Sequence, residues 1–385
     1  MIPKHISIAV DASRCRSGGA VAHLKGIFTY LNPEKHGISE VHLWTYKKIQ
    51  IQIPNYKWLI KHDSIELEKS LFHQVYWQAF QLPREIKKNH CQILFTVDAS
   101  TVCTYKPQVV LSQDMLSYEP GIMSLFGWGF ARIRLIIILW LQNSAFRRAA
   151  GVIFLTHYAG NVIQKSCGQL SDITVVPHGI GENFKLIHNR IQWPKNMERP
   201  IQVLYVSNAA MYKYQWNVVK AIEILREKKY NIKLILTGGG SGKAQVKLNN
   251  QISASDPKKE FVSQMSFIPH SDLPALISNS DIYVFASGCE NMPNTLVEGM
   301  AVGLPIACSN RGPMPEILDI GGIYFDPASP NFIANSIEHI ICDDQFRNRI
   351  SLKGRDLSEQ YSWQRCSDET WGYIANTFRK HSGYN

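Results

Sequence analysis

The segment DIYVFASGCENMPNTLVEGMAVGLPIACSN, residues 281–310, predicts a strand, a loop, a short helix and a second strand in succession. The strands are expected at Ile282–Phe285 and Pro305–Cys308, which are short and continuously apolar. Such runs are typical of parallel strands buried on both faces of a sheet, because a strand with one wet face alternates polar and apolar residues. The segment therefore favours an α/β fold with a parallel sheet.

The same pattern recurs on both sides of a polar stretch near residues 188–200, which carries prolines at 194 and 200 and predicts a linker. Two Rossmann-like domains are expected, over residues 1–195 and 196–365, and a C-terminal helix over residues 366–385 can return to the first domain. The further strands are expected at Ile6–Val10, Gln92–Val97, Val109–Leu111, Gly151–Leu155, Ile201–Val206 and Lys233–Thr237.

The composition is that of an ordinary globular chain, with 385 residues of which 45% are hydrophobic. Its eight cysteines include no C-x-x-C pair, and the start MIPKHISIAVDAS lacks the charged and apolar regions of a signal peptide. The longest strongly apolar run, Leu135–Leu141, is far shorter than the roughly 20 residues that span a bilayer. A cytoplasmic protein with reduced thiols and no transmembrane helix is expected.

Polar and glycine-rich loops follow the expected strands, at the edge where ligands bind in parallel sheets. Gly18 and Gly19 precede a helix and can bring backbone N–H groups to an anion, although a simple tight turn explains them equally well. The loop TGGGSGK, Thr237–Lys243, fails the P-loop pattern because Ala244 stands where Ser or Thr is needed, and G-x-G-x-x-G fails at Lys243. ATPase and NAD-dehydrogenase functions therefore lose their main support.

Two carboxylates flank the start of the helix in the opening segment. Glu290 lies on the loop, Asn294 is the expected N-cap, and Gly303 is expected to end the helix. Free N–H groups of the first turn favour an anionic ligand, and Glu298 is placed to accept hydrogen bonds from sugar hydroxyls beside it. The alternative is a solvated loop glutamate and an ordinary first-turn glutamate, stabilised by the helix dipole by about 0.3–1 kcal/mol.

With these residues in view, the chain resembles a glycosyltransferase of family 4. The specific signal is E-x7-E, Glu290 and Glu298, inside ENMPNTLVEGMAVGLPIACSNRGPMPEIL. Further matches are LYVSNAAMYKYQWNVVKA (residues 204–221), LTGGG (236–240) and SGGA (17–20). The resemblance implies a GT-B fold, with two Rossmann-like domains facing a central cleft, and the absence of a D-x-D triplet agrees with a family that needs no metal or other cofactor.

The resemblance also implies roles for particular residues. Glu290 would orient the donor sugar near the reacting carbon, Glu298 would hold the nucleotide ribose, and Lys213 would neutralise the diphosphate. The family's second phosphate cation is replaced by Asn208, unless Arg14 or Arg16 supplies that charge. The implied site is thus catalytic Glu290 and Lys213, with Glu298, Asn208, Gly18, Gly19, Asn294, Thr295, Leu296 and Gly238 on the donor.

A second departure from the family lies in VVLSQDMLSYEP, where Gln113 and Asp114 stand near the usual position of a histidine beside the donor sugar. The implied reaction is retaining transfer of a hexose from a nucleoside diphosphate sugar to a saccharide acceptor, as in the synthesis of a bacterial surface polysaccharide. A sugar-nucleotide epimerase or phosphorylase, or an inactive sugar-nucleotide-binding protein, remains an alternative.

The net charge of +10 lies entirely in the first half of the chain. Residues 1–200 carry 23 Lys and Arg against 13 Asp and Glu, whereas residues 201–385 carry 18 of each. Arg132, Arg134, Arg147 and Arg148 flank the apolar run with Trp140, and no nucleic-acid motif accompanies them. Peripheral binding to the anionic inner face of the cytoplasmic membrane, near a lipid-linked acceptor, is expected. A buried core helix is the alternative.

Overall fold

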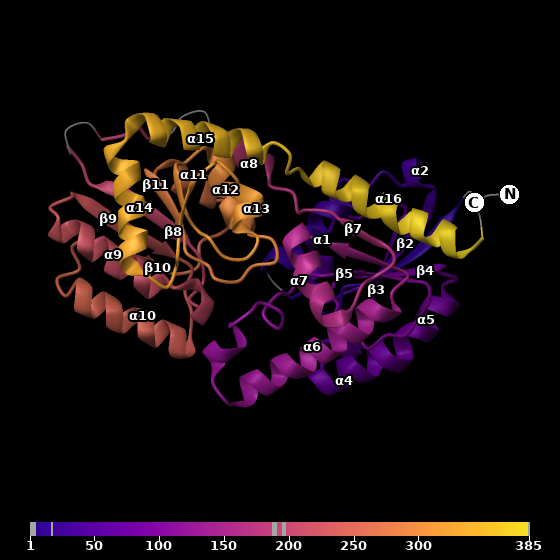
Figure 1. Ribbon diagram of the computed structural model, residues 1–385. Helices are drawn as coiled ribbons and strands as arrows, with labels where there is room; N and C mark the ends of the chain where they lie inside the picture. Colours follow the sequence, from indigo (N-terminus) through magenta and orange to yellow (C-terminus); the bar gives the residue numbers. More distant parts are fainter. Residues whose placement is uncertain (1–4, 17, 187–190, 195–197, 384–385) are drawn as a thin grey trace. The chain divides into compact units, whose positions relative to one another are not determined.

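The computed structural model describes residues 5–16, 18–186, 191–194 and 198–383. The chain divides into two compact units, each with its own parallel sheet (Figure 1). The N-terminal unit comprises residues 1–123, 128–179 and 361–385, and the C-terminal unit comprises residues 124–127 and 180–360. Among the described residues, no helix combines the length and the apolar character needed to span a bilayer.

The sheet of the N-terminal unit has the strand order β3-β2-β1-β4-β5-β6-β7, and all its neighbours pair in parallel. The central strands are buried along their whole length, as their continuous apolar sequences require. The strands are β1 Ile6–Asp11, β2 Ile38–Trp44, β3 Leu59–His62, β4 Ile93–Thr96, β5 Gln108–Leu111, β6 Gly151–Phe154 and β7 Ile173–Val175.

Helices cover both faces of this sheet. The C-terminal helix α16 packs on α1, where Ser367 Oγ and Trp371 Nε1 each donate to the carbonyl of Ile27 at 2.8 Å. The main helices are α1 Gly18–Thr29, α4 Leu71–Tyr76, the π-helical turn η2 Trp77–Gln81, α5 Leu82–Lys88, α6 Phe130–Arg148, α7 His157–Cys167 and α16 Trp363–His381. Short turns of helix are α2 Pro33–His36, α3 Lys47–Gln50 and η1 Ile65–Glu68. The turn η3 Met123–Phe126 begins in this unit and continues into residues 124–127, which belong to the C-terminal unit.

The C-terminal unit repeats this topology with the order β10-β9-β8-β11-β12-β13. Its strands are β8 Ile201–Val206, β9 Ile232–Thr237, β10 Val262–Met265, β11 Ile282–Phe285, β12 Ile306–Ser309 and β13 Ile323–Phe325. Its helices are α8 Glu182–Lys185, η5 Met211–Lys213, α9 Gln215–Glu227, α10 Gly242–Ser255, α11 Leu273–Ser278, α12 Asn294–Val302, α13 Met314–Leu318, α14 Pro330–Cys342 and α15 Asp344–Ser358.

The eight strands expected from the sequence are confirmed, each to within one residue at either end. The expected linker near 188–200 and the boundary at 195/196 include residues outside the described set, 188–190 and 195–197. The division into units instead falls after Gly179, because α8 contacts α12 and Lys185 pairs with Glu359 at 3.4 Å. Of the segment predicted as a C-terminal helix, 366–385, residues 366–381 belong to α16 in the N-terminal unit.

Candidate functional site

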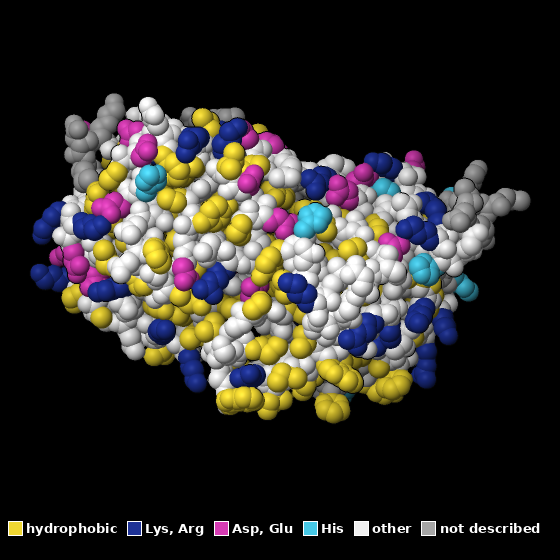
Figure 2. All heavy atoms as spheres, in the orientation of Figure 1, with side chains coloured by type: hydrophobic (Ala, Val, Ile, Leu, Met, Phe, Trp, Pro, Cys, Tyr) yellow, Lys and Arg dark blue, Asp and Glu magenta, His cyan; other side chains and the backbone are white. Residues whose placement is uncertain are grey.

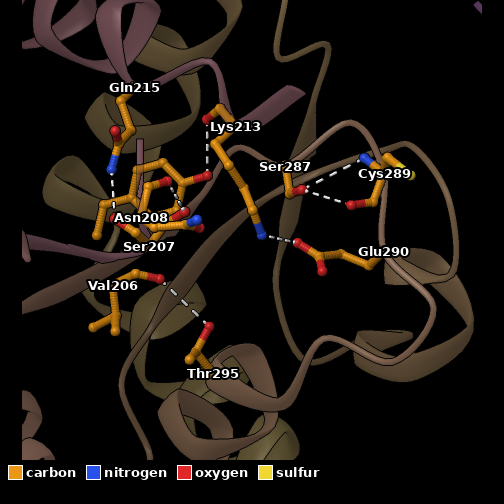
Figure 3. Close-up of polar contacts among 10 residues, drawn as sticks. Val206, Ser207, Asn208, Lys213, Gln215, Ser287, Cys289, Glu290 and Thr295 are labelled. Carbon is orange, nitrogen blue, oxygen red and sulfur yellow. Dashed lines mark hydrogen bonds and ion pairs between the residues drawn. The ribbon is translucent and has the colours of Figure 1, made fainter. Parts of the chain in front are cut away.

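An ion pair of Lys213 and Glu290 lies at the carboxyl edge of the C-terminal sheet, the edge where its strands end. Lys213 Nζ donates to Glu290 Oε1, and Figure 3 shows the two side chains pointing toward each other. Their side chains are only 12% and 16% exposed. A pair this far from water interacts strongly, and removing one partner leaves an uncompensated charge.

Paired strands bring these two residues together. Lys213 follows β8 and Glu290 follows β11, and the two strands are neighbours in the sheet. The connecting loops are tied by the backbone, since the N–H of Gly288 donates to the carbonyl of Tyr212 at 2.7 Å. The hydroxyl of Tyr205 in β8 also donates to the carbonyl of Lys213 at 2.8 Å. Hydrogen bonds to main-chain carbonyl groups therefore fix the position of Lys213 and of the loop that carries Glu290.

Helix α12 begins beside this pair, but its cap differs from the expected one. Asn294 is the first helical residue and Pro293 occupies the N-cap, so the prediction that Asn294 caps the helix is wrong. The Pro293 carbonyl accepts from the N–H groups of Leu296 and Val297, and Asn294 N–H donates to Met292 O at 3.0 Å. Fewer first-turn N–H groups are available than expected, and the N–H of Thr295 is not among these donors.

The end and the anchoring of α12 agree with its sequence. Gly303 is the C-cap in the left-handed region at φ 78°, as predicted from the glycine at that position. The hydroxyl of Thr295 donates to the carbonyl of Val206 at 3.4 Å, which ties the helix start to the end of β8 (Figure 3).

Glu298 lies inside α12 and is almost fully buried, with 5% of its surface exposed. Its Oε1 is 2.7 Å from His270 Nε2, whereas its Oε2 has no hydrogen-bond partner among the described residues. Burial raises the pKa of the Glu298 carboxyl above its usual value, and the neighbouring His270 offsets part of that rise. A buried oxygen without a partner is costly unless something else hydrogen-bonds to it.

His270 is a residue that the sequence analysis did not identify. It lies on the loop between β10 and α11, outside the E-x7-E segment, and its contact with Glu298 crosses 28 positions of sequence. Its side chain is 60% exposed. No motif or periodicity marks this position, so only the fold could reveal it.

The glycine loop after β9 lies against the loop after β8. Gly238 has φ +99°, and a Cβ there would lie 2.7 Å from the carbonyl oxygen of Ser207. Glycine is therefore required at this position for two reasons, the backbone conformation and the close approach. The exposed side chain of Asn208 follows Ser207 at the same edge, so Asn208, Gly238, Lys213 and Thr295 all lie at the ends of β8 and β9 or beside them.

The predicted residues of the N-terminal unit lie at the carboxyl edge of its own sheet. Gly18 begins α1 with φ +63°, and both Gly18 and Gly19 are exposed. The two nearby arginines already have partners, because Arg16 donates to Tyr46 OH at 3.0 Å and to Gln74 Oε1 at 2.7 Å, and Arg14 donates to Gln78 at 3.4 Å.

Gln113 and Asp114 follow β5 and are partly buried. Asp114 Oδ1 accepts from the backbone N–H of Leu116 at 3.0 Å, and burial raises the pKa of its carboxyl. Gln113 Nε2 is buried without a partner among the described residues. Within the same described ranges, no three His, Cys, Asp or Glu side chains form a group that could hold a metal ion.

Comparison with known proteins supplies the identity of this edge. The family model "Glycosyl transferases group 1" matches residues 188–357, the segment that carries Lys213, Glu290 and Glu298. Over this segment the chain is similar to group 1 glycosyltransferases. The resemblance drawn from the E-x7-E segment is thereby confirmed.

Similar proteins agree with that assignment. Over 168 residues the chain is 26% identical to O-antigen chain mannosyltransferase B of Escherichia coli, a match that covers 43% of this chain and 44% of that protein. The chain thus matches less than half the length of this relative.

Solved structures match over nearly the whole chain. Sucrose-phosphate synthase of Thermosynechococcus elongatus superposes with a TM-score of 0.76 at 15% identity, covering 99% of this chain and all of that one. HepE of Anabaena, in complex with UDP-glucose, matches with a TM-score of 0.69 at 18% identity, covering 97% of this chain and 99% of that one. The chain therefore has a GT-B fold, as the sequence predicted.

Proposed function

We propose that this chain is a retaining hexosyltransferase that moves a hexose from a nucleoside diphosphate sugar to a saccharide hydroxyl. The observation that carries the proposal is the Lys213–Glu290 pair beside the first turn of α12. It offers one cation for a diphosphate and one carboxylate for sugar hydroxyls within a few ångströms. The group 1 family model and the UDP-glucose bound by HepE on the same fold support this donor class.

The leaving diphosphate sets the catalytic demand. The bond from the anomeric carbon to the phosphate oxygen breaks, the bond to the acceptor oxygen forms on the same face, and the acceptor proton passes to the departing phosphate. Lys213 and the N-terminal end of α12, with the N–H of Thr295, would stabilise the negative charge that grows on that phosphate. When the donor binds, its phosphate oxygens would replace Glu290 as the partner of Lys213. The Glu290 carboxylate would then be available to orient the sugar.

Glu298 is proposed to hold the nucleotide ribose. Its Oε2, which has no partner among the described residues, would accept a hydrogen bond from a ribose hydroxyl. That bond would remove the free-energy cost of a buried oxygen without a hydrogen bond. Asn208, Asn294, Leu296 and Gly238 would line the donor from the same edge, while Gly18, Gly19, Gln113 and Asp114 would contribute from the N-terminal unit.

The acceptor is proposed to be a lipid-linked saccharide that is a precursor of a surface polysaccharide. The chain would reach it by binding peripherally to the anionic inner face of the cytoplasmic membrane. The O-antigen assignment of the mannosyltransferase relative and the basic first half of the chain support this choice. Transfer is proposed to need no metal, on the absence of a D-x-D triplet. Unchanged turnover after chelation with EDTA is the expected result, and recovery of lost turnover by added Mg²⁺ or Mn²⁺ would contradict it.

A donor panel tests the central proposal. GDP-mannose, UDP-glucose and UDP-N-acetylglucosamine are each added, and the melting temperature is measured, because a ligand of the native state stabilises it by mass action. One donor should raise the melting temperature of the parent and not of Glu290→Gln/Lys213→Ala. Release of nucleoside diphosphate that depends on acceptor separates transfer from epimerisation, and donor binding without any turnover would favour the inactive binding protein.

A further inference from the structure

Two helical segments of the N-terminal unit carry large apolar side chains outward. In α4 and η2, Phe72, Tyr76 and Phe80 recur every four residues, and Phe72 is 87% exposed. In α6 and the residue pair before it, Trp128 is 90% exposed and Trp140 is 78% exposed. We call the whole set the apolar face; its members are Leu71, Phe72, Tyr76, Phe80, Trp128, Phe130, Ile133, Ile136, Ile137 and Trp140.

The two segments lie in one layer. The connections β3 to β4 and β5 to β6 run in the same direction along the sheet, so right-handed crossovers place both helical segments on the same face. Gln78 of η2 accepts from the N–H of Val102 at 3.2 Å, and Gln142 of α6 donates to Ser100 Oγ at 3.1 Å, in the same loop. Figure 2 shows hydrophobic side chains gathered along the lower edge of the face in view, where Figure 1 places α4 and α6.

Polar groups on the opposite sides of these helices fix this orientation. Gln74 and Gln78 of α4 and η2 point inward, where Gln74 donates to the carbonyl of Lys69 at 2.9 Å and Gln78 to Asp11 Oδ2 at 2.6 Å. In α6, Asn143 donates to Ser166 Oγ at 3.0 Å. Turning either helix to hide its apolar stripe would break these buried hydrogen bonds, so the outward stripe is a built feature.

Within the two segments that carry the apolar face, the charges are of one sign. Residues 71–81 contain no Lys, Arg, Asp or Glu, and residues 120–148 contain four arginines and no acidic residue. Arg132 stacks on the ring of Trp128 with 4.0 Å between its Cζ and the ring centroid, and the side chain of Arg134 is exposed. Basic side chains beside exposed Trp and Tyr are the combination that an anionic lipid headgroup layer attracts.

We propose that the apolar face docks reversibly on an anionic phospholipid bilayer, with α6 and α4 lying in the plane of the headgroups. A continuous apolar patch of this kind marks an interaction surface, and in-plane helices with a basic rim bind membranes without spanning them. A symmetric pair of chains through this face would place Arg132 and Arg134 of both copies in one interface, and residues 120–148 offer no carboxylate to balance them, which disfavours a second copy as the occupant. The inference rests on the proposed function, since it supplies the route to a lipid-linked acceptor.

Vesicle co-sedimentation tests the docking surface. The parent chain should pellet with vesicles that contain phosphatidylglycerol and stay in the supernatant with pure phosphatidylcholine. Phe72→Ser/Trp140→Ser should lower the bound fraction about tenfold or more with an unchanged melting temperature, since both side chains are exposed. The matched control is Phe332→Ser/Leu352→Ser, which removes exposed apolar side chains from the C-terminal unit.

A second variant separates charge from apolar contact. Arg132→Gln/Arg134→Gln should weaken binding at low salt and flatten its salt dependence. Equal recovery of the parent in the supernatant with both lipids, or equal loss in the control variant, would overturn the proposal. So would a concentration-dependent dimer that the Phe72→Ser/Trp140→Ser change abolishes. Donor-induced melting shifts are measured on the same samples, so failure of docking and failure of the transferase proposal remain distinguishable.

Discussion

The two units build the same strand order but use the carboxyl edges of their sheets differently. In the C-terminal unit, ionisable side chains from different segments meet at this edge, Lys213 with Glu290 and His270 with Glu298. In the N-terminal unit the polar groups at the corresponding edge hold the unit together, because Asp11 accepts from the N–H of Ser13 at 3.0 Å and from Gln78. Topology therefore locates an edge, and the loops decide whether its charges serve a ligand or the fold.

The N-terminal unit differs also in what it shows to solvent. The side-chain amides of Gln74, Gln78 and Asn143 face inward, so its outer face is apolar with basic residues beside it. In the C-terminal unit, exposed apolar residues such as Val246, Ile320 and Leu352 are far apart in the sequence. Under the two proposals above, charge chemistry belongs to one unit and membrane docking to the other. Each prediction below would break or sharpen that division.

The largest effect is expected at Lys213. Lys213→Ala should lower kcat/KM about 30- to 1000-fold, or ~2–4 kcal/mol, the scale of losing one preorganised charge donor. Lys228→Ala, which breaks the 2.6 Å pair with Glu338, is the control and should leave turnover unchanged. Steady-state kinetics of Arg16→Ala sharpens the test. A loss as large as that of Lys213→Ala would show that the N-terminal unit supplies phosphate charge after all.

Replacing Glu298 should affect donor affinity more than folding. Glu298→Gln should weaken nucleoside diphosphate binding by about tenfold or more, because hydrogen bonds to a charged acceptor are worth ~1.5–3 kcal/mol. Its free energy of unfolding should not fall at neutral pH, since burial raises the pKa of Glu298 and the neutral amide avoids the cost of a buried charge. Calorimetric titration and urea denaturation measure the two. Glu227→Gln, an exposed change on α9, is the control, and undiminished affinity would remove Glu298 from the donor site.

Gly238 tests the loop that supports this edge. Gly238→Ala should lower the free energy of unfolding by about 1–3 kcal/mol, because a side chain at φ +99° is strained and its Cβ would meet the Ser207 carbonyl oxygen at 2.7 Å. Gly239→Ala is the matched control, since a Cβ there meets nothing within 4 Å. Urea denaturation decides the matter, and equal midpoints for the two variants would show that the loop adapts without cost.

The sequence predicted strands and loops well and contacts between loops poorly. Continuous apolar runs locate buried parallel strands because little else in a soluble chain requires them, so Ile201–Val206 and Ile282–Phe285 were placed to the residue. The cap of α12 was misplaced because Asn294 is a favoured N-cap by type, while Pro293 holds that position in the fold. Sequence preference at a helix end is a tendency that the preceding loop can override.

Which residues of α6 are exposed could not be predicted from the sequence, for a related reason. Apolar content suggests a buried helix, but which side of a helix faces the core depends on the partners of its polar residues. Leu135 is buried as the core alternative required, yet Ile136, Ile137 and Trp140 of the same run are exposed. The inward hydrogen bonds of Gln142 and Asn143 become visible only when the strands and loops beneath them are in place.

The smallest predicted effect concerns His270, whose position against Glu298 no sequence pattern revealed. His270 lowers the pKa of Glu298, while burial raises it by more. Because its pKa is raised, Glu298 binds a proton at a higher pH than an ordinary carboxyl does. The protonated oxygen then no longer accepts a hydrogen bond, which would weaken the proposed contact with a ribose hydroxyl. Removing His270 raises that pKa further, so His270→Ala should lose donor affinity at a higher pH than the parent.

The expected size of this change is modest because the His270 side chain is 60% exposed and screened by water. A loss of roughly two- to fivefold on the acid side is expected, in line with ~0.2–1 kcal/mol for an exposed pair. Nucleoside diphosphate affinity is measured as a function of pH, with His339→Ala on α14 as the control for an exposed histidine of the same unit. If the acid limb of His270→Ala coincides with that of the parent, His270 does not tune Glu298. The paired charges of the C-terminal edge would then act in the Lys213–Glu290 contact alone.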